Sequence, residues 1–272
     1  MRTRALKKFG VLALAVCLLA LSLPAVSLSS CAPQEPPAPP PAPYVSPINW
    51  KQLVQGENGR FAYYRNGVLQ SRFGVDVSEH QGYINWQAAA ADGVEFALIR
   101  IGNRGATEGL LYRDVYYEAN IRDAEEAGVL VGVYFFSQAI TEVEAREEAR
   151  FVLKYLDGRH LDYPVAYDHE RVLGPDGRAN HLTGEEISRC AEAFFKVIQT
   201  AGYDTMLYGN RSDLYRLDNA LLDSHDLWLA EYDAPRPTIQ RDIVIWQYTS
   251  SGNVEGIDTQ VDLNIHFLLP KT

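Results

Sequence analysis

The sequence predicts an α/β fold, a β/α barrel closed by eight strands in which some of the late helices are missing. Eight short apolar runs typical of buried strands occur within about 200 residues. Helix-like stretches separate the early runs, and this alternation favours a mainly parallel sheet. The alternative is an open, doubly wound sheet, but no glycine-rich phosphate-binding loop follows the first run.

The elements follow one another in a regular order. The strand-like runs are Phe73–Val77, Phe96–Ile101, Val129–Phe136, Pro164–Tyr167, Thr205–Tyr208, Leu227–Ala230, Ile243–Tyr248 and Gln260–Leu263. The helix-like stretches lie at about 85–92, 113–127, 142–157 and 184–201. Each is followed by a glycine suited to a helix end: Gly93, Gly128, Gly158 and Gly202.

Helix starts are also marked in the sequence. The patterns Thr141-x-x-Glu144 and Thr183-x-x-Glu186 have the form of capping boxes. The acidic segment 142–148 (EVEAREE) is interpreted as a solvent-exposed helix face.

Three segments are expected to precede the barrel of residues 73–272. Residues 1–30 form a signal peptide, with a basic start and an apolar run from Val11 to Leu23 that is short for a membrane span. The sequence LSSC that ends at Cys31 resembles a bacterial lipobox, so we expect Cys31 to be lipidated; ordinary secretion is the alternative. Residues 31–47 form a Pro-rich linker, and residues 48–72, with two Asn-Gly pairs, a small β-hairpin extension.

Composition limits the partners. The formal net charge is −10, and loss of residues 1–30 leaves 21 basic against 35 acidic residues, a charge of −14. Nucleic acid is excluded as a partner, because its binding needs a basic surface. A lipidated Cys31 would hold the protein to a membrane through its lipid anchor, outside the cytoplasm. Cys17 leaves with the signal peptide, so Cys190 has no disulfide partner, and a monomer is the default.

Polar residues gather where the strand-like runs end. In a β/α barrel the chemistry lies at the carboxyl ends of the strands, and five charged residues are placed there: Asp76, Arg100, Asp168, Glu170 and Asp262. Aromatic residues occur at the same ends: Tyr134, Tyr167, Tyr208 and Trp228. An acidic, aromatic-lined mouth suits sugar cleavage, because aromatic faces stack on sugars and paired carboxylates do acid/base work.

The segment Asp168-His169-Glu170 is the sharpest local signal. Residues i and i+2 of a strand point to one side, so the two carboxyl groups are expected to be neighbours. An isolated D-x-E is usually a pair of solvated loop acids, but the preceding apolar strand and the company of Asp76 and Asp262 favour a site. His169 is expected to point away from the pair and to pack or to form a hydrogen bond, not to act as a base or ligand. No metal-ligand spacing is present, so neither a metal nor another cofactor is expected.

Several motifs occur in an order that resembles one family. They are FGVDVSEHQGYINW (73–86), VGVYFFS (131–137), YPVAYDHE (163–170), LWLAEY (227–232) and IWQY (245–248), followed by GI (256–257) and VDLN (261–264). Together they resemble family 25 of the glycoside hydrolases, the lysozymes also called N-acetylmuramidases, over about residues 73–268. The resemblance implies an irregular (β/α) barrel of TIM type with five helices and three late strands without helices.

The resemblance also implies a reaction and a set of roles. The reaction is hydrolysis of the β-1,4 bond between N-acetylmuramic acid and N-acetylglucosamine in peptidoglycan glycan strands. By the family pattern Glu170 is the general acid, Asp168 assists it, and Asp76 and Asp262 complete the acidic set. The substrate-binding residues would be Tyr134, Tyr167, Tyr208, Trp228, Tyr232 and Gln247, together with Arg100. His169 departs from the Trp that relatives often carry, which puts the fine substrate preference in doubt.

Two other functions stay open at this point. A non-catalytic, wall-binding lipoprotein would keep the barrel for glycan recognition, but it has no need of Asp168 and Glu170, and both are present. Another barrel glycosidase, such as a chitinase, would share the acid chemistry but not the flanking motifs.

Overall fold

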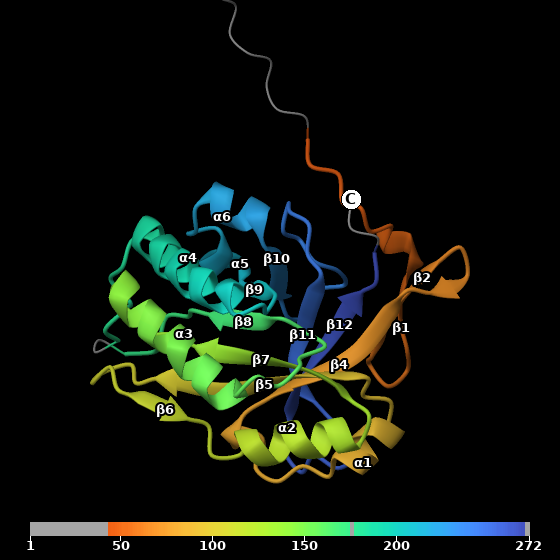
Figure 1. Ribbon diagram of the computed structural model, residues 1–272. Coiled ribbons are helices and arrows are strands. Elements are labelled where there is room, and N and C mark those ends of the chain that lie inside the picture. Colours follow the sequence, from red (N-terminus) through yellow and green to blue (C-terminus); the bar gives the residue numbers. More distant parts are fainter. Residues whose placement is uncertain (1–42, 175–176, 270–272) are drawn as a thin grey trace, which may run out of the picture. The chain divides into compact units, whose positions relative to one another are not determined.

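In the computed structural model, which describes residues 43–174 and 177–269, eight strands close into a barrel (Figure 1). The expected signal peptide, the proposed lipidation site Cys31 and most of the Pro-rich linker lie outside the described residues. Among the helices that are described, none combines the length and the apolar composition that a membrane span requires.

The barrel strands are the eight that the sequence predicts. They are β4 (Ser71–Val77), β5 (Phe96–Arg104), β7 (Leu130–Phe136), β8 (Val165–Asp168), β9 (Thr205–Asn210), β10 (Asp226–Ala230), β11 (Ile245–Gly252) and β12 (Val261–Phe267). Neighbours from β4 through β5 to β11 pair in parallel. The last strand, β12, lies between β11 and β4 and runs antiparallel to both, and it closes the barrel. A short strand, β6 (Leu111–Arg113), extends the end of β5 as a hairpin.

Alternation along the strands sorts the side chains into two layers. One face of β5 points Phe96 and Leu98 into the barrel interior, where side chains from the facing strands meet them. The other face points Ala97 and Ile99 toward the helices, which cover the outside of the barrel (Figure 1). Gly74 on β4 leaves room for this packing, because a Cβ there would lie 2.4 Å from the Phe96 ring.

The helices follow the early strands, as predicted. Within the described residues they are α1 (Trp86–Ala91), α2 (Tyr117–Glu126), α3 (Glu142–Leu156), α4 (Gly184–Thr200), α5 (Arg211–Leu214) and α6 (Asn219–Ser224), with single turns η1 (Trp50–Gln52) and η2 (Glu79–Gln81). The connection from β9 to β10 holds two short helices, so six helices stand where five are implied. In the described part of the chain β10, β11 and β12 are followed by no helix, which agrees with the expectation for the late strands.

The helix ends confirm most of the predicted signals. The four predicted glycines adopt left-handed φ angles between 76° and 103°, which only glycine adopts without strain. At α4 the Thr183 hydroxyl accepts from the Glu186 N–H, and the Glu186 carboxylate accepts from the Thr183 N–H. At α3 only half of the predicted box forms, because the Glu144 carboxylate accepts from the Ile140 N–H instead.

The acidic start of α3 is not wholly solvent-exposed, and that expectation is wrong at one residue. Glu142 and Glu147 are exposed, but Glu148 is fully buried. Its carboxylate accepts a hydrogen bond of 2.8 Å from Arg104 Nε on β5. One acid of this charged run, Glu148, therefore faces inward and lies on the apolar side of its helix.

The segment before the barrel forms a three-stranded antiparallel sheet. Its strands are β1 (Leu53–Gln55), β2 (Phe61–Arg65) and β3 (Val68–Leu69). An Asn66-Gly67 turn, with positive φ at both residues, joins β2 to β3. The sheet packs on the barrel, where the Phe61 ring lies 4.9 Å from the Trp246 ring and the Tyr63 ring 5.7 Å from the Phe267 ring.

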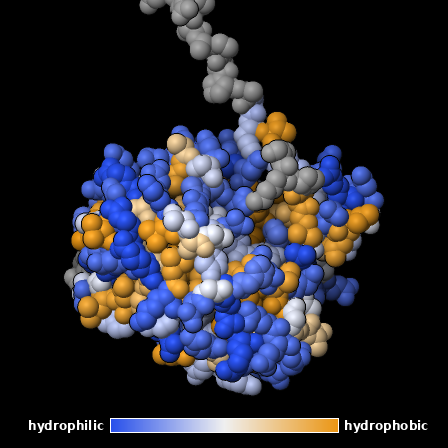
Figure 2. All heavy atoms as spheres, viewed as in Figure 1, coloured by the Kyte–Doolittle hydropathy of each residue, from blue (hydrophilic) through white to orange (hydrophobic). Residues whose placement is uncertain are grey.

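This small sheet keeps three apolar residues in solvent. Val54, Val68 and Leu69 are exposed, and Figure 2 shows scattered hydrophobic surface within a mainly hydrophilic face of the protein. Scattered apolar residues of this kind are ordinary for a soluble surface.

Candidate active site

Four carboxyl groups meet at one end of the barrel. Asp76 lies near the end of β4, Asp168 ends β8, and Glu170 follows it. Asp262 was expected at the carboxyl end of the eighth strand, and this is wrong in one respect: it is the second residue of β12. Because β12 is antiparallel, its beginning lies at the same mouth, where Asp262 is paired in register with Asp76.

Asp76 lies at the centre of the polar network. It is 5% exposed, and its Oδ2 accepts hydrogen bonds of 2.8 Å from Gln247 Nε2 and 2.7 Å from Asn264 Nδ2. Burial raises the pKa of Asp76 to about 6, while the two amide donors pull it down. Asn264 was not among the predicted site residues. It is two positions after Asp262 on one strand, and period-2 alternation would have placed it on the same face.

Asp262 forms a pair with Asp76. Burial raises the pKa of Asp262 to about 8, and the charge of Asp76 and a hydrogen bond to it act in the same direction. A hydrogen bond between two carboxyl groups requires a proton on one of them. The pair therefore shares a proton near neutral pH and titrates as a unit.

Asp168 and Glu170 form the second pair. Burial, with the charges of Glu170 and Asp76, raises the pKa of Asp168 well above its usual range, and Arg100 opposes this. Burial and the charge of Asp213 raise the pKa of Glu170, which hydrogen-bonds Asp168. Asp168 is 3% exposed, whereas Glu170 is half-buried and closer to solvent. The mouth thus holds two pairs of neighbouring acids whose pKa values burial raises, rather than four free carboxylates.

Aromatic and amide side chains lie around these acids. Tyr208 and Tyr232 both donate to Gln247 Oε1, at 3.0 and 2.7 Å, and Gln247 in turn donates to Asp76. Trp228 is buried, lies 4.3 Å from the Tyr208 ring, and donates from Nε1 to Asn264.

The other rings around the mouth differ in exposure. Tyr134 packs edge-on to Trp228 with ring centroids 5.9 Å apart. Tyr232 is 42% exposed and presents its ring to solvent. Among the rings that hydrogen-bond this amide network, Tyr232 is therefore the one open to a ligand.

Two predicted substrate-binding residues are placed differently. Tyr167 faces away from the mouth, because it alternates with Asp168 along β8. It is 1% exposed and packs against Phe194 and Phe195 of α4. His169 lies on the same outer side, buried and stacked on Tyr167, in agreement with the prediction that it packs.

Arg100 is the second of these residues. It pairs with the buried Asp114 at 2.9 Å and with Glu79 at 2.9 Å, and so ties the loop after β4 to the hairpin after β5. Its guanidinium is held by protein acids and acts on the mouth through its charge. Within residues 43–174 and 177–269, no three His, Cys, Asp or Glu side chains are grouped so as to hold a metal ion.

Comparisons with known proteins agree with this geometry. Residues 75–257 match the family model described as glycosyl hydrolases family 25. The chain is 30% identical over 192 residues to an autolytic lysozyme from Clostridium acetobutylicum, across 70% of this chain and 54% of that protein. It is 27% identical over 205 residues to Lysozyme M1 from Streptomyces globisporus, across 70% and 66% of the two chains.

The fold has relatives among solved structures. The modular autolysin LytC from Streptococcus pneumoniae superposes with a TM-score of 0.66 at 24% identity, over 79% of this chain and 52% of that one. At this identity the likeness concerns the barrel fold. The chain spans about half the length of the autolytic lysozyme and of LytC.

Proposed function

The chain belongs to family 25 of the glycosyl hydrolases, and we propose that it hydrolyses the β-1,4 bond between N-acetylmuramic acid and N-acetylglucosamine in peptidoglycan. The observation that carries the proposal is the meeting of four acids, Asp76, Asp168, Glu170 and Asp262, at the ring-lined mouth of the barrel. Burial raises the pKa of the carboxyl groups there, and glycoside hydrolysis needs a carboxyl group that can donate a proton to the leaving oxygen. The lysozymes among the relatives support the substrate class.

Glu170 is the proposed general acid. It is the more exposed member of its pair, so a glycosidic oxygen in the mouth can reach it, whereas Asp168 lies buried behind it. Burial and the charge of Asp213 raise the pKa of Glu170, so it stays protonated to higher pH than an ordinary glutamate. Asp76 and Asp262 would hold the second proton and set the electrostatic field around the first pair.

Asp168 is proposed to assist rather than to attack the sugar. In retaining enzymes with a protein nucleophile the two carboxyl groups stand about 5–5.5 Å apart, on opposite sides of the bond. Here they come from one strand end, two residues apart, and so approach the bond from similar directions. The 2-acetamido oxygen of the substrate would then attack the anomeric carbon, and Asp168 would orient it and stabilise the oxazolinium ion. A glycosyl adduct on Asp168, or an inverted anomer in the first product, would contradict this route.

Sugar subsites are proposed along the ring-lined part of the mouth. Tyr232 is exposed and its hydroxyl is fixed by Gln247, so its ring is presented in one orientation for stacking. Tyr134, Tyr208 and Trp228 lie deeper and would form the floor. Tyr167 is not part of the proposed subsites, because it packs against α4.

The test of the activity is Glu170→Gln, which keeps shape and removes the donated proton. General acid catalysis contributes about 10²–10⁴-fold, so lysis of purified cell walls should fall at least that far. Product masses from the unaltered protein should show N-acetylmuramic acid at the new reducing end. A wall-binding protein without catalysis would release no such product and would be unaffected by the substitution.

We also propose an extracytoplasmic, membrane-anchored location for a monomeric protein. The support is the lipobox-like sequence at Cys31 and the Pro-rich residues that follow it. Acyl chains contribute about 0.8 kcal/mol per buried CH₂, so a lipidated Cys31 would attach stably. Cys31→Ser should move the protein from the membrane to the soluble fraction. If the unaltered protein is already soluble, the anchor is refuted while the activity is not.

A further inference from the structure

The main chain at Glu170 is held by a neighbouring segment rather than by its own strand. The β8 strand ends at Asp168. The Asp168 carbonyl accepts a hydrogen bond of 2.7 Å from the N–H of Ser137, which lies just beyond β7. Two residues later, the Glu170 carbonyl accepts a hydrogen bond of 2.9 Å from Nε2 of the Gln138 side chain. Consecutive residues of one segment therefore hold both members of the acid pair by their backbones.

Gln138 is an unusual residue for packing alone. Its side chain is fully buried, and its Oε1 has no hydrogen-bond partner within the described part of the chain. A buried amide with an unpaired acceptor lowers stability, so burial does not account for it. Its one side-chain hydrogen bond goes to the backbone of Glu170.

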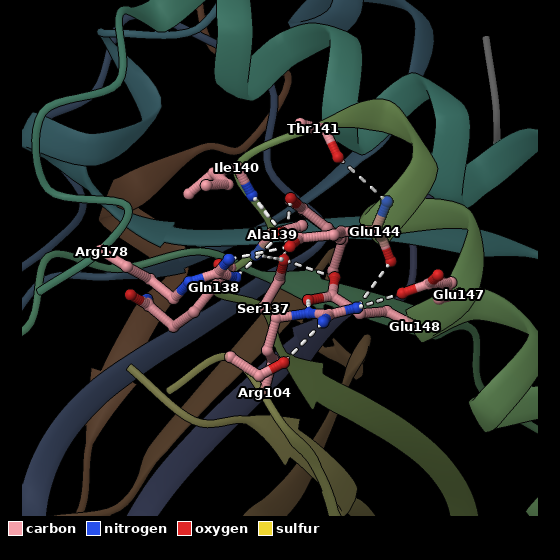
Figure 3. Close-up of polar contacts among 12 residues, drawn as sticks. Arg104, Ser137, Gln138, Ala139, Ile140, Thr141, Glu144, Glu147, Glu148 and Arg178 are labelled. Atoms are coloured by element: carbon pink, nitrogen blue, oxygen red, sulfur yellow. Dashed lines mark hydrogen bonds and ion pairs between the residues drawn. The ribbon is translucent and has the colours of Figure 1, made fainter. Parts of the chain in front are cut away.

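The segment that carries Gln138 is itself fixed by charged residues (Figure 3). Arg178 donates a hydrogen bond of 2.9 Å to the Gln138 carbonyl, and it forms an ion pair of 2.8 Å with Glu144. The Ser137 hydroxyl donates a hydrogen bond of 2.6 Å to the buried Glu148. Arg104 on β5 donates another hydrogen bond to the same carboxylate.

The Ser137 hydroxyl also lies 3.0 Å from the Tyr167 hydroxyl, so the segment contacts β8 at a side chain as well. A buried ion pair, a hydroxyl and an amide thus form a continuous connection from the helix layer to the acid pair. This connection leaves the segment no freedom to shift without breaking charged contacts.

We propose that Gln138 is a positioning residue that holds Glu170 at the height in the mouth where its proton reaches the glycosidic oxygen. This inference rests on the proposed function, in which Glu170 is the general acid. Gln138 touches no substrate; it acts through the backbone of Glu170. A misplacement of about 1 Å in a reacting group costs about 10²-fold in rate, so one lost hydrogen bond has a large effect here.

The experiment compares Gln138→Met with a matched control on two substrates. Methionine keeps the length of the side chain and removes the donor. The control is Gln199→Met. It removes a hydrogen bond of 2.8 Å that the Gln199 side-chain amide donates to the Thr205 hydroxyl, at the opposite end of the barrel. One substrate is a soluble peptidoglycan oligosaccharide. The other is an aryl β-glycoside of the same muramoyl disaccharide, whose phenolate leaves without needing a proton.

Gln138→Met should lower kcat on the oligosaccharide by about 10²-fold with KM within about twofold, because the lost interaction serves the transition state. On the aryl glycoside the loss should be far smaller, and Gln199→Met should leave both rates near normal. Equal losses on the two substrates, or a change in KM alone, would overturn the positioning role. Circular dichroism reports folding, and Gln138→Leu serves if the methionine variant does not fold.

Glu170→Gln separates this inference from the proposal beneath it. If Glu170→Gln loses activity selectively on the oligosaccharide and Gln138→Met does not, Glu170 remains the acid and only the positioning role fails. If Glu170→Gln itself shows no dependence on the leaving group, the general acid has been misassigned.

Discussion

Replacement of Asp262 by asparagine should make the protein more stable and less active. Asp262 is held against Asp76 in a site that burial and like charge make unfavourable for ionisation. Asparagine has nearly the same shape, and its amide can donate to Asp76 where the wild-type pair must keep a proton. The unfavourable pair is then gone, and so is one of the four acids of the mouth.

The magnitude follows from the pKa of Asp262, which folding raises from 3.8 to about 8. At pH 7 the unfolded chain has lost a proton that the folded protein still binds, which lowers the free energy of unfolding by about 4 kcal/mol. Asp76 shares this cost, so the expected gain in Asp262→Asn is about 2–4 kcal/mol. For a domain of this size that corresponds to a melting temperature higher by roughly 5–10 °C.

The direction of the pKa shift determines how the free energy of unfolding changes with pH. The folded pKa lies above the unfolded value, so the folded protein binds more protons between about pH 4 and pH 8, and wild-type stability falls as pH rises through that window. Asparagine does not titrate. The stability difference between Asp262→Asn and wild type should be small at pH 4, grow through pH 7 and level off above about pH 8.

The assay is urea unfolding at pH 4, 6, 7 and 8.5, beside wall lysis by the same samples. Asp258→Asn serves as the matched control, because Asp258 is exposed in the same β11–β12 connection. The reasoning is refuted if Asp262→Asn is destabilised at pH 7, or if its advantage over wild type does not change with pH.

Three further outcomes follow from the packing. Gly74→Ala should lower the free energy of unfolding by about 1–3 kcal/mol in thermal melts, because the new Cβ would lie 2.4 Å from the Phe96 ring; an unchanged melting temperature would contradict this. The Cys190 thiol, which is buried and whose pKa burial raises to about 12, should resist an aromatic disulfide reagent until the protein is unfolded. Arg104→Met should cost about 3–5 kcal/mol in urea unfolding, because it leaves Glu148 buried without its cation; a loss below about 1 kcal/mol would show that the pair is dispensable.

Local patterns in the sequence were enough to predict the elements of the barrel. The strand-like runs coincide with the eight barrel strands, and the helix-ending glycines adopt the left-handed backbone that the pattern requires. These features depend on neighbours in the chain, which a single sequence displays. The two short helices α5 and α6 span four and six residues, and neither is followed by a glycine like the one that marks the end of the equally short α1.

The site was only partly predictable, for two different reasons. The outward side of Tyr167 follows from the sequence alone, because a strand that points Asp168 inward must point the preceding residue outward. The direction of β12 was not available, because a period-2 pattern reads the same whichever way the strand runs. The burial of Glu148 was also hidden, because its partner Arg104 lies 44 positions away in the sequence.

The antiparallel last strand determines when the protein acquires its chemistry. Asp76 accepts a hydrogen bond from Asn264 across 188 positions of the chain, and Asp262 arrives on the same strand. A nascent chain that lacks β12 has no closed barrel, and Asp76 lacks both the Asn264 donor and the neighbouring Asp262. Contacts this distant in sequence form late, because a long loop must close before they stabilise anything. The acidic site is thereby incomplete until the last strand of the barrel has been made.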